Sequence, residues 1–433
     1  MKAALPIALA ALCLTQPPAA LAQTEMEAGS QAEQSMLESR ADDVVAVLNG
    51  ELPAADVFSA NFLAAVSEQQ LEIMNAQLSA QFGPLLAVES VDPVSSTGAR
   101  VAFRFERATG SGGMEISAAP PFLIEGLRLS SFAAIDDNAA KIANDLDGLP
   151  GQVSVYFGPL KDGEPLFARD VSTAYPIGST FKLYVLSALA RSIAAGERAW
   201  SDVVPLSVAS LPSGRLHNWP QGTPITLQSL ATMMIAASDN TATDQLIAVL
   251  GRAAVEAELR ASGHGNPDAT LPFLTTLEMF ALKTRTKRGA AYAEASEDEQ
   301  QELIEALAAE LNGTPEGTGI TRWSEARLIE EVEWFADMDD LRGILARLAE
   351  LEDPVARQIM AVNQSMPGAI ARKWDYIGYK GGSEPGVLNF TWLLRDKQGA
   401  WHMLAMSWKD ESNSLNEQSF QLFAQRIIAL PRD

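Results

Sequence analysis

The chain has 433 residues, of which 47% are hydrophobic, and carries a formal net charge of −23. The length predicts at least two domains with packed cores, and the acidity excludes nucleic acid and anionic membrane surfaces, which attract basic patches. One cysteine allows no disulfide, and three widely separated histidines predict neither a metal site nor a cofactor.

The N-terminus has the features of an export signal. Lys2 precedes an apolar run from Ala3 to Leu14, and Ala20-Leu21-Ala22 offers small residues for cleavage before Gln23. The run is shorter than the roughly 20 residues that a membrane-spanning helix needs, so no membrane insertion is expected. We therefore expect a signal peptide over 1–22, a flexible polar leader over 23–35, and a periplasmic or secreted protein.

Residues 36–132 predict a small α+β domain. Helical periodicity covers 36–48 and 60–80, and alternating strands follow at 101–105, at 114–116 after a Gly110–Gly113 turn, and at 122–129. This order of elements resembles the nuclear-transport-factor/ketosteroid-isomerase type of fold. Residues 133–149, rich in Asp and Asn, are interpreted as a linker.

Residues 150–433 predict a larger domain with strands at both ends. A hairpin follows Gln152, helical patterns fill 179–351, and two strands at 387–395 and 401–408 precede a last helix over 417–428. We expect an antiparallel sheet formed by distant segments, with helices packed against it.

Three short motifs in this domain indicate nucleophilic catalysis: Ser179-Thr180-Phe181-Lys182, Ser238-Asp239-Asn240 and Lys380-Gly381-Gly382. Residues three apart share a helix face, so Lys182 lies beside the Ser179 hydroxyl and could activate it as a base. That role requires a lowered lysine pKa, from burial or from a neighbouring cation such as Lys380. Taken singly, Ser238 also fits a helix cap and Gly381-Gly382 a bulge.

Together the motifs resemble those of serine β-lactamases (class A) and penicillin-binding proteins. The resemblance implies a β-lactamase/transpeptidase-like fold, with Ser179 as nucleophile, Lys182 as base, Ser238 as proton relay and Lys380 as the cation beside it. It also implies that the backbone amides of Ser179 and Ser383 form an oxyanion hole. The residues that the resemblance implies for substrate binding are Asn240, Gly381, Gly382 and Ser383. Two-domain proteins of this kind resemble clavam-pathway β-lactamase-like proteins.

The chain departs from the family pattern in two places. Gly381 stands where threonine is usual, which removes a hydroxyl beside the substrate carboxylate. Thr275-Thr276 resembles the segment after the family's deacylation loop, so that loop is predicted to be short and to lack its glutamate, and Asp244 stands where an asparagine usually braces it. Asp268 and Glu384 are candidate replacement bases, interpreted as exposed loop residues.

These features predict a serine acyl-hydrolase acting on a small β-lactam or ester, with acylation retained and deacylation slow. A D,D-peptidase or esterase acting on a non-lactam substrate is the alternative enzyme. A non-catalytic ligand-binding or sensor protein is the alternative of a different class.

Overall fold

The computed structural model describes residues 19–135, 137–211, 213–312 and 319–431. The expected signal peptide over 1–22 therefore lies largely outside the described residues. The chain divides into two compact units, Met1–Ile135 and Asp136–Asp433. Within the described ranges, no helix combines the length and apolar character needed to cross a membrane.

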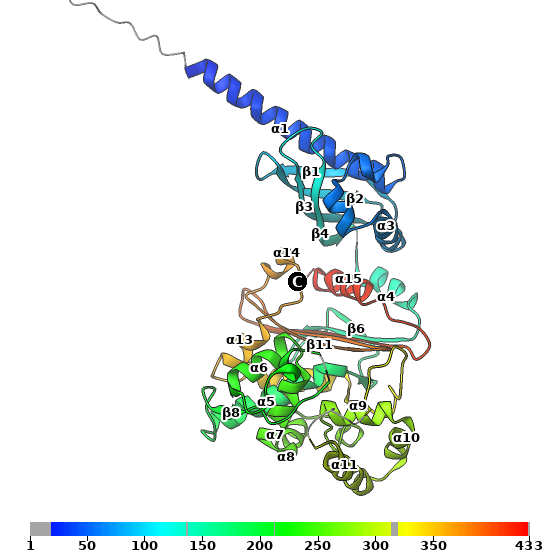
Figure 1. Cartoon of the computed structure of the whole chain (residues 1–433), viewed down its shortest axis with the longest axis vertical. Coiled ribbons are helices and arrows are strands. Elements are labelled where there is room, and N and C mark those ends of the chain that lie inside the picture. The colour runs from blue at the N-terminus through cyan, green and yellow to red at the C-terminus, as the bar shows by residue number, and fades with distance from the viewer. Residues whose placement is uncertain (1–18, 136, 212, 313–318, 432–433) are drawn as a thin grey trace, which may run out of the picture. The chain divides into compact units, whose positions relative to one another are not determined.

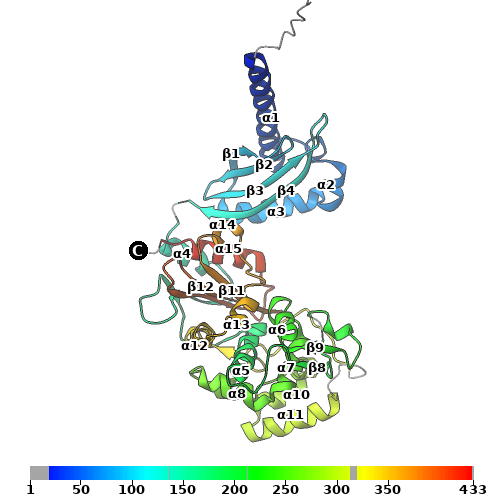
Figure 2. The same ribbon diagram turned by 90° about the vertical axis from the view of Figure 1, so that its left-hand side faces the viewer.

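The first unit packs helices against a four-stranded antiparallel sheet (Figure 2). A capping box between Ser67 and Gln70 starts α3, and Phe82 at its end stacks on Phe132 of β4 with ring centroids 4.9 Å apart. The strands follow one another as a meander, β1-β2-β3-β4. The elements are α1 (Ala19–Leu48), η1 (Ala54–Asp56), α2 (Ala60–Ala65), α3 (Glu68–Phe82), β1 (Leu85–Pro93), β2 (Gly98–Phe105), β3 (Ala108–Ile116) and β4 (Ile124–Ala134).

Two predictions for this unit are wrong. The leader expected at residues 23–35 belongs to α1, because its Ala, Glu, Gln and Met residues are strong helix formers. The turn expected at Gly110–Gly113 lies inside β3, where pairing with both β2 and β4 outweighs the weak strand preference of glycine. The likeness to the nuclear-transport-factor fold stays a prediction.

The second unit is a five-stranded antiparallel sheet between two helical layers, as expected for residues 150–433 (Figure 1). The sheet order is β11-β12-β13-β5-β6, so segments from both ends of the unit pair at its centre. The strands are β5 (Gln152–Pro159), β6 (Phe167–Arg169), β11 (Tyr376–Glu384), β12 (Val387–Arg395) and β13 (Trp401–Lys409). The edge strand β11 carries the third motif.

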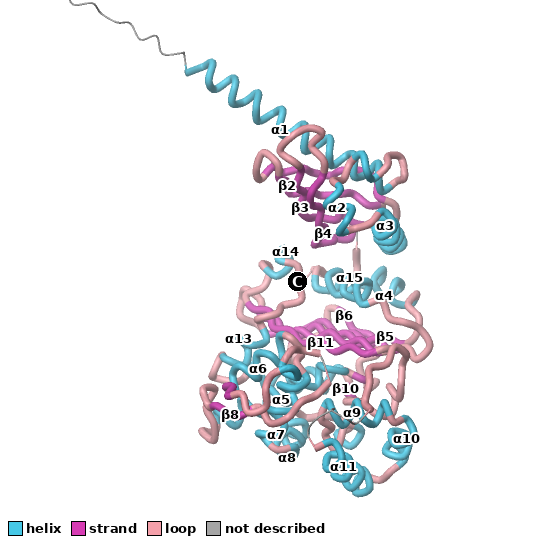
Figure 3. The backbone as a smooth tube through the Cα atoms, viewed as in Figure 1, coloured by secondary structure: helices cyan, strands magenta, loops and turns pink. Residues whose placement is uncertain are grey.

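Figure 3 shows α4 and α15 on one face of this sheet and the larger helical layer on the other. The first pair comprises α4 (Ala139–Asp147) and α15 (Glu417–Ile428). The other layer contains α5 (Lys182–Ala194), α6 (Leu227–Ala236), α7 (Asn240–Leu250), α8 (Arg252–Ala261), α9 (Thr276–Thr284), α10 (Thr286–Glu294), α11 (Glu297–Leu311), α12 (Met338–Ala349) and α13 (Val355–Met360).

The boundary between the two units, at Ile135 and Asp136, falls inside the linker expected at 133–149, but most of that segment is helix α4. Ile142 and Leu146 lie four residues apart, so they share one helix face and are buried against the sheet. Arg426 of α15 binds Asp137 at 2.8 Å and Asp145 at 2.6 Å, which fixes the two helices together. The Asp and Asn residues of this segment are thus a polar helix face and an N-cap at Asn138.

The helices α9–α11 belong to a long excursion between α8 and a short strand, β10 (Phe335–Ala336). This strand pairs with β7 (Tyr175–Pro176) immediately before the first motif. The chain therefore returns to the nucleophile at Phe335, about 60 residues after Thr275-Thr276. Thr275 caps α9.

Candidate active site

The structure places Ser179 on a rigid turn. It lies in a 3₁₀ turn, η2 (Gly178–Phe181), and it is the one residue of that turn that is not buried. Phe181 stacks on Trp334 with ring centroids 3.7 Å apart, and Thr180 donates a 2.7 Å hydrogen bond to Asn389 of β12. The packed neighbours hold the turn while the nucleophile faces outward.

Lys182 begins α5 directly behind this turn and is completely buried. Its Nζ donates to Ser238 O at 2.8 Å, to Ser238 Oγ at 3.2 Å and to Asn240 Oδ1 at 2.7 Å. Burial, followed by the positive charge of Lys380, lowers the pKa of Lys182 well below its usual value. The lowered pKa favours the neutral amine that a general base requires.

Lys380 approaches the same serine from β11. Its Nζ donates to Ser238 Oγ at 3.0 Å and to the carbonyl of Gly381, and burial lowers its pKa to about 7. Ser238 has a φ of 53°, a left-handed conformation that is uncommon outside glycine and that here aims the hydroxyl between the two amines. The structure thus brings Lys182, Ser238 and Lys380 into one hydrogen-bonded group.

The backbone of β11 packs against the nucleophile turn. A Cβ at Gly382 would overlap Ile177 O and lie 2.6 Å from Ser179 N, so only glycine permits this approach. A Cβ at Gly178 would lie 3.1 Å from Ser383 N. The amides of Ser179 and Ser383, expected to form an oxyanion hole, therefore lie on adjoining backbones.

Asn240 was expected to offer its amide to the substrate, and the structure gives it an internal role. The residue is 5% exposed, its Oδ1 accepts from Lys182, and its Nδ2 donates to Leu211 O at 3.1 Å. Its side chain therefore fixes the lysine amine.

Gly381 is matched to its neighbour on the strand, Tyr379. A Cβ at Gly381 would overlap the Tyr379 hydroxyl and lie 2.9 Å from Cζ, and the tyrosine ring packs on Trp392 at 4.9 Å. The phenol thus occupies the place where a threonine side chain would begin. The packing of Tyr379 therefore accounts for the glycine, rather than threonine, at position 381.

We expect Gly381→Thr to lower the free energy of unfolding by about 1–3 kcal/mol, because the new side chain overlaps the phenol. Tyr379→Phe/Gly381→Thr should recover part of this loss, since the overlapping oxygen is gone. Urea unfolding of the single and double variants tests this. Equal stability of wild type and Gly381→Thr would contradict the proposed overlap.

Asp244 lies in α7, one helical turn after Asn240, and binds the start of α9. Its carboxylate accepts from Thr276 N and Oγ1, both at 2.8 Å, and from Leu277 N at 3.0 Å. Burial raises its pKa to about 6 despite these bonds. Asp244 stands where the family usually has an asparagine. In this protein its carboxylate binds the first residues of helix α9.

We expect the stability advantage of wild type over Asp244→Asn to shrink as pH rises. The folded pKa of about 6 lies above the unfolded value of 3.8, so the folded state binds the extra proton between them and loses stability through that window. A shift of about two pKa units corresponds to roughly 3 kcal/mol. Urea unfolding of both proteins between about pH 4 and pH 7 measures the difference; a constant difference would refute the assignment.

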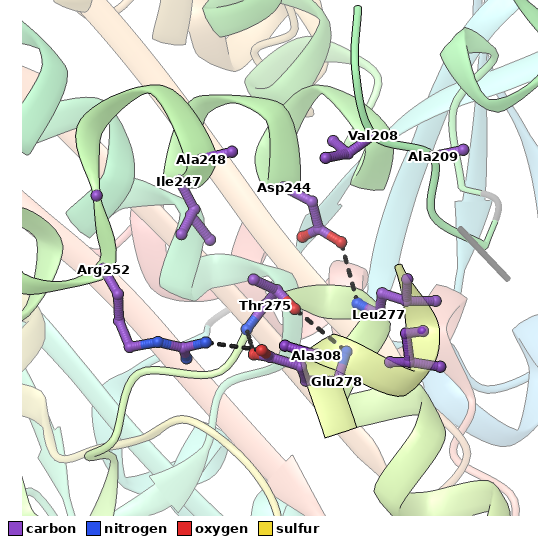
Figure 4. Close-up of a pocket in the computed structure, with 12 residues that line it drawn as sticks. Val208, Ala209, Asp244, Ile247, Ala248, Arg252, Thr275, Leu277, Glu278 and Ala308 are labelled. Atoms are coloured by element: carbon purple, nitrogen blue, oxygen red, sulfur yellow. Dashed lines mark hydrogen bonds and ion pairs between the residues drawn. The ribbon is translucent and has the colours of Figure 1, made fainter. Parts of the chain in front are cut away.

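A pocket of about 350 Å³ opens beside Asp244, where Figure 4 shows the carboxylate directed at Leu277 and Arg252 directed at Glu278. The Arg252–Glu278 ion pair is 2.7 Å long. None of the residues that line the pocket is a motif residue. The lining is formed by Val208, Ala209, Asp244, Ile247, Ala248, Gly251, Arg252, Thr275, Leu277, Glu278, Ala308 and Leu311.

Of the two acids considered as replacement bases, Asp268 is an exposed residue as expected, with 71% of its side chain accessible. Glu384 is not, and its interpretation as an exposed loop residue is wrong. It ends β11 with a side chain that is 10% exposed and paired with Lys283. The period of two along a strand, which puts Glu384 on the same face as Lys380, was the signal that could have revealed this.

Residues 137–322 match the family model described as the β-lactamase enzyme family. The matched residues include the motifs at Ser179–Lys182 and Ser238–Asn240, whereas the third motif, Lys380-Gly381-Gly382, lies beyond them. No curated protein matches the sequence. Across the described residues, no group of three His, Cys, Asp or Glu side chains is arranged to hold a metal ion.

The second unit is similar to several solved structures, each matched over 67% of this chain. A β-lactamase from Sphaerobacter thermophilus is 20% identical, with 94% of its chain covered and a TM-score of 0.46. A protein described as PBP-A is 16% identical, with 93% covered and a TM-score of 0.47. A β-lactamase from Francisella tularensis is 15% identical, with 96% covered and a TM-score of 0.47.

Proposed function

We propose that this protein is an exported serine acyl-hydrolase that opens β-lactams or cleaves esters through an acyl-enzyme on Ser179. The observation that carries the proposal is the position of Ser238 Oγ, 3.2 Å from the Lys182 amine and 3.0 Å from that of Lys380. Such a chain of hydrogen bonds can move a proton from the nucleophile to a leaving group.

In the proposed acylation, Ser179 Oγ attacks the carbonyl carbon and passes its proton to neutral Lys182. The amides of Ser179 and Ser383 stabilise the resulting oxyanion, and such a donor contributes on the order of 10²–10³ in rate. When the lactam C–N or ester C–O bond breaks, the proton returns through Ser238 to the leaving nitrogen or oxygen. Lys380 is the cation available to a substrate carboxylate.

Hydrolysis of the acyl-enzyme is proposed to be the slow step, because the family's glutamate loop has no counterpart between Glu258 and Glu278. A positioned general base contributes about 10²–10⁴ in rate. Esters and substrates with good leaving groups would acylate well and then accumulate as adducts.

Incubation with a fluorescent penicillin, nitrocefin and an alkyl fluorophosphonate, followed by intact-protein mass, tests this proposal. We expect one adduct per chain on Ser179 and nitrocefin turnover. A stable penicillin adduct without turnover would favour a penicillin-binding peptidase or a sensor, and labelling by the fluorophosphonate alone would favour an esterase. Absence of every adduct would support a non-catalytic binding protein.

Export to the periplasm or the medium is part of the proposal and is supported by Lys2 and the apolar run from Ala3 to Leu14. Protein purified from its native host should begin at Gln23. An N-terminal sequence that retains the apolar run would refute it.

A further inference from the structure

A buried cluster of three charged side chains lies outside the three motifs. Lys283 in the last turn of α9 donates to Glu333 Oε1 at 2.8 Å and also to Glu384 Oε1. The side chains of Lys283 and Glu333 are fully buried, whereas that of Glu384 is 10% exposed. Glu384 is therefore the member of the cluster that meets solvent.

The charges of the cluster do not balance if both carboxyls are ionised, since one ammonium faces two carboxylates. A buried net charge is costly, and a shared proton removes it, as in carboxyl pairs generally. Glu384 Oε2 is buried and finds no hydrogen-bond donor among the described residues, which fits a proton held between the two acids. Burial, followed by the charge of Glu333, raises the pKa of Glu384 well above its usual value.

The cluster adjoins the nucleophile turn. Lys380, Gly382 and Glu384 alternate along one face of β11, and Gly382 packs against Ser179 N. Two residues of strand span about 7 Å, so Glu384 lies one such step beyond Gly382, on the side away from Lys380. Glu333 precedes Trp334, whose carbonyl accepts from Ile177 N at 3.0 Å and whose indole stacks on Phe181.

We propose that Glu384, sharing a proton with Glu333, is the general base that activates water for hydrolysis of the Ser179 acyl-enzyme. This inference rests on the proposed function. Water attacks the acyl carbonyl carbon and gives its proton to the Glu384 carboxylate. The tetrahedral intermediate then breaks its bond to Ser179 Oγ, which takes the proton back, releasing the carboxylic acid and restoring both groups.

Glu384→Gln is the sharpest variant, because its amide can donate to Glu333 where the shared proton lay and so preserve the packing. We expect deacylation to slow by about 10²–10⁴, so that the penicillin adduct accumulates in intact-mass time courses, while adduct formation continues. Asp268→Asn is the matched control, an acid-to-amide change at an exposed residue, and should deacylate as wild type does.

Two outcomes would overturn the assignment. One is a deacylation rate in Glu384→Gln equal to that of wild type, with an unchanged melting temperature. The cluster would then have only a structural role. The other is deacylation in Asp268→Asn that is as slow as in Glu384→Gln. Absence of any adduct on wild-type Ser179 would instead refute the proposed function, and the assignment with it.

Glu333→Gln gives an independent test of the role of Glu384 if Glu384→Gln folds poorly. Lys283 and Glu333 are the charged groups that act most strongly on Glu384. Removing the charge of Glu333 lowers the pKa of Glu384, so the acid limb of the deacylation rate should move to lower pH. A limb that stays in place or moves to higher pH would contradict a base at Glu384.

Discussion

Replacing Ser179 by alanine should remove covalent labelling by penicillin and reduce turnover by roughly 10⁶-fold, the order of loss seen when a serine nucleophile is deleted. The two hydroxyls of the neighbouring motif positions cannot take its place: Thr180 is buried and bound to Asn389, and Ser238 Oγ is held between two amines. Intact-protein mass and initial rates with nitrocefin measure both effects.

Ser172→Ala is a suitable control, since Ser172 is an exposed residue seven positions before the nucleophile. It should label and turn over as the wild type does. If Ser179→Ala still formed a penicillin adduct, the nucleophile would have to be another residue and the proposed chemistry would fail.

Replacing Lys182 by methionine should slow acylation by about 10²–10⁴, the usual contribution of a positioned base. In the wild type the lysine must be neutral to act, so the acylation rate should rise with pH through the lowered pKa of Lys182 and then level off. The variant should lose this acid limb along with most of the rate. Stopped-flow labelling with a fluorescent penicillin between about pH 5 and pH 9 tests both points.

Lys380→Met separates the two causes of the lowered pKa of Lys182, which are burial and the positive charge of Lys380. The positive charge of Lys380 lowers the pKa of Lys182, so neutralising it raises that pKa and moves the acid limb of acylation to higher pH. The position of the limb is the readout, because the amplitude also reflects weaker substrate binding. A limb displaced to lower pH would show that the two amines do not repel each other as the structure indicates.

The sequence was a good guide wherever a pattern was local. The motif at Ser179–Lys182, the strands predicted at 387–395 and 401–408 and the helix over 417–428 all follow from short-range periodicity and spacing. The convergence of Ser238 and Lys380 on Lys182 required the resemblance as well, since it joins residues up to 198 positions apart.

Features made by distant segments could not be predicted in this way. The Lys283–Glu333–Glu384 cluster joins three separate stretches, and no local pattern shows that their charged side chains meet. The return of the chain at Phe335–Ala336 depends on pairing with β7, which only the folded excursion brings about. Helix α4 was missed because its two buried residues are surrounded by Asp and Asn, which are typical of loops.

The fit between Gly381 and Tyr379 restricts the order in which this edge of the site can change. Acquiring the family's hydroxyl at position 381 while the phenol is present gives an intermediate that is less stable than its parent. Loss of the phenol oxygen has to come first, through a step that by itself brings no hydroxyl to position 381. Laboratory selection for penicillin hydrolysis should therefore recover changes at position 379 before, or together with, changes at 381.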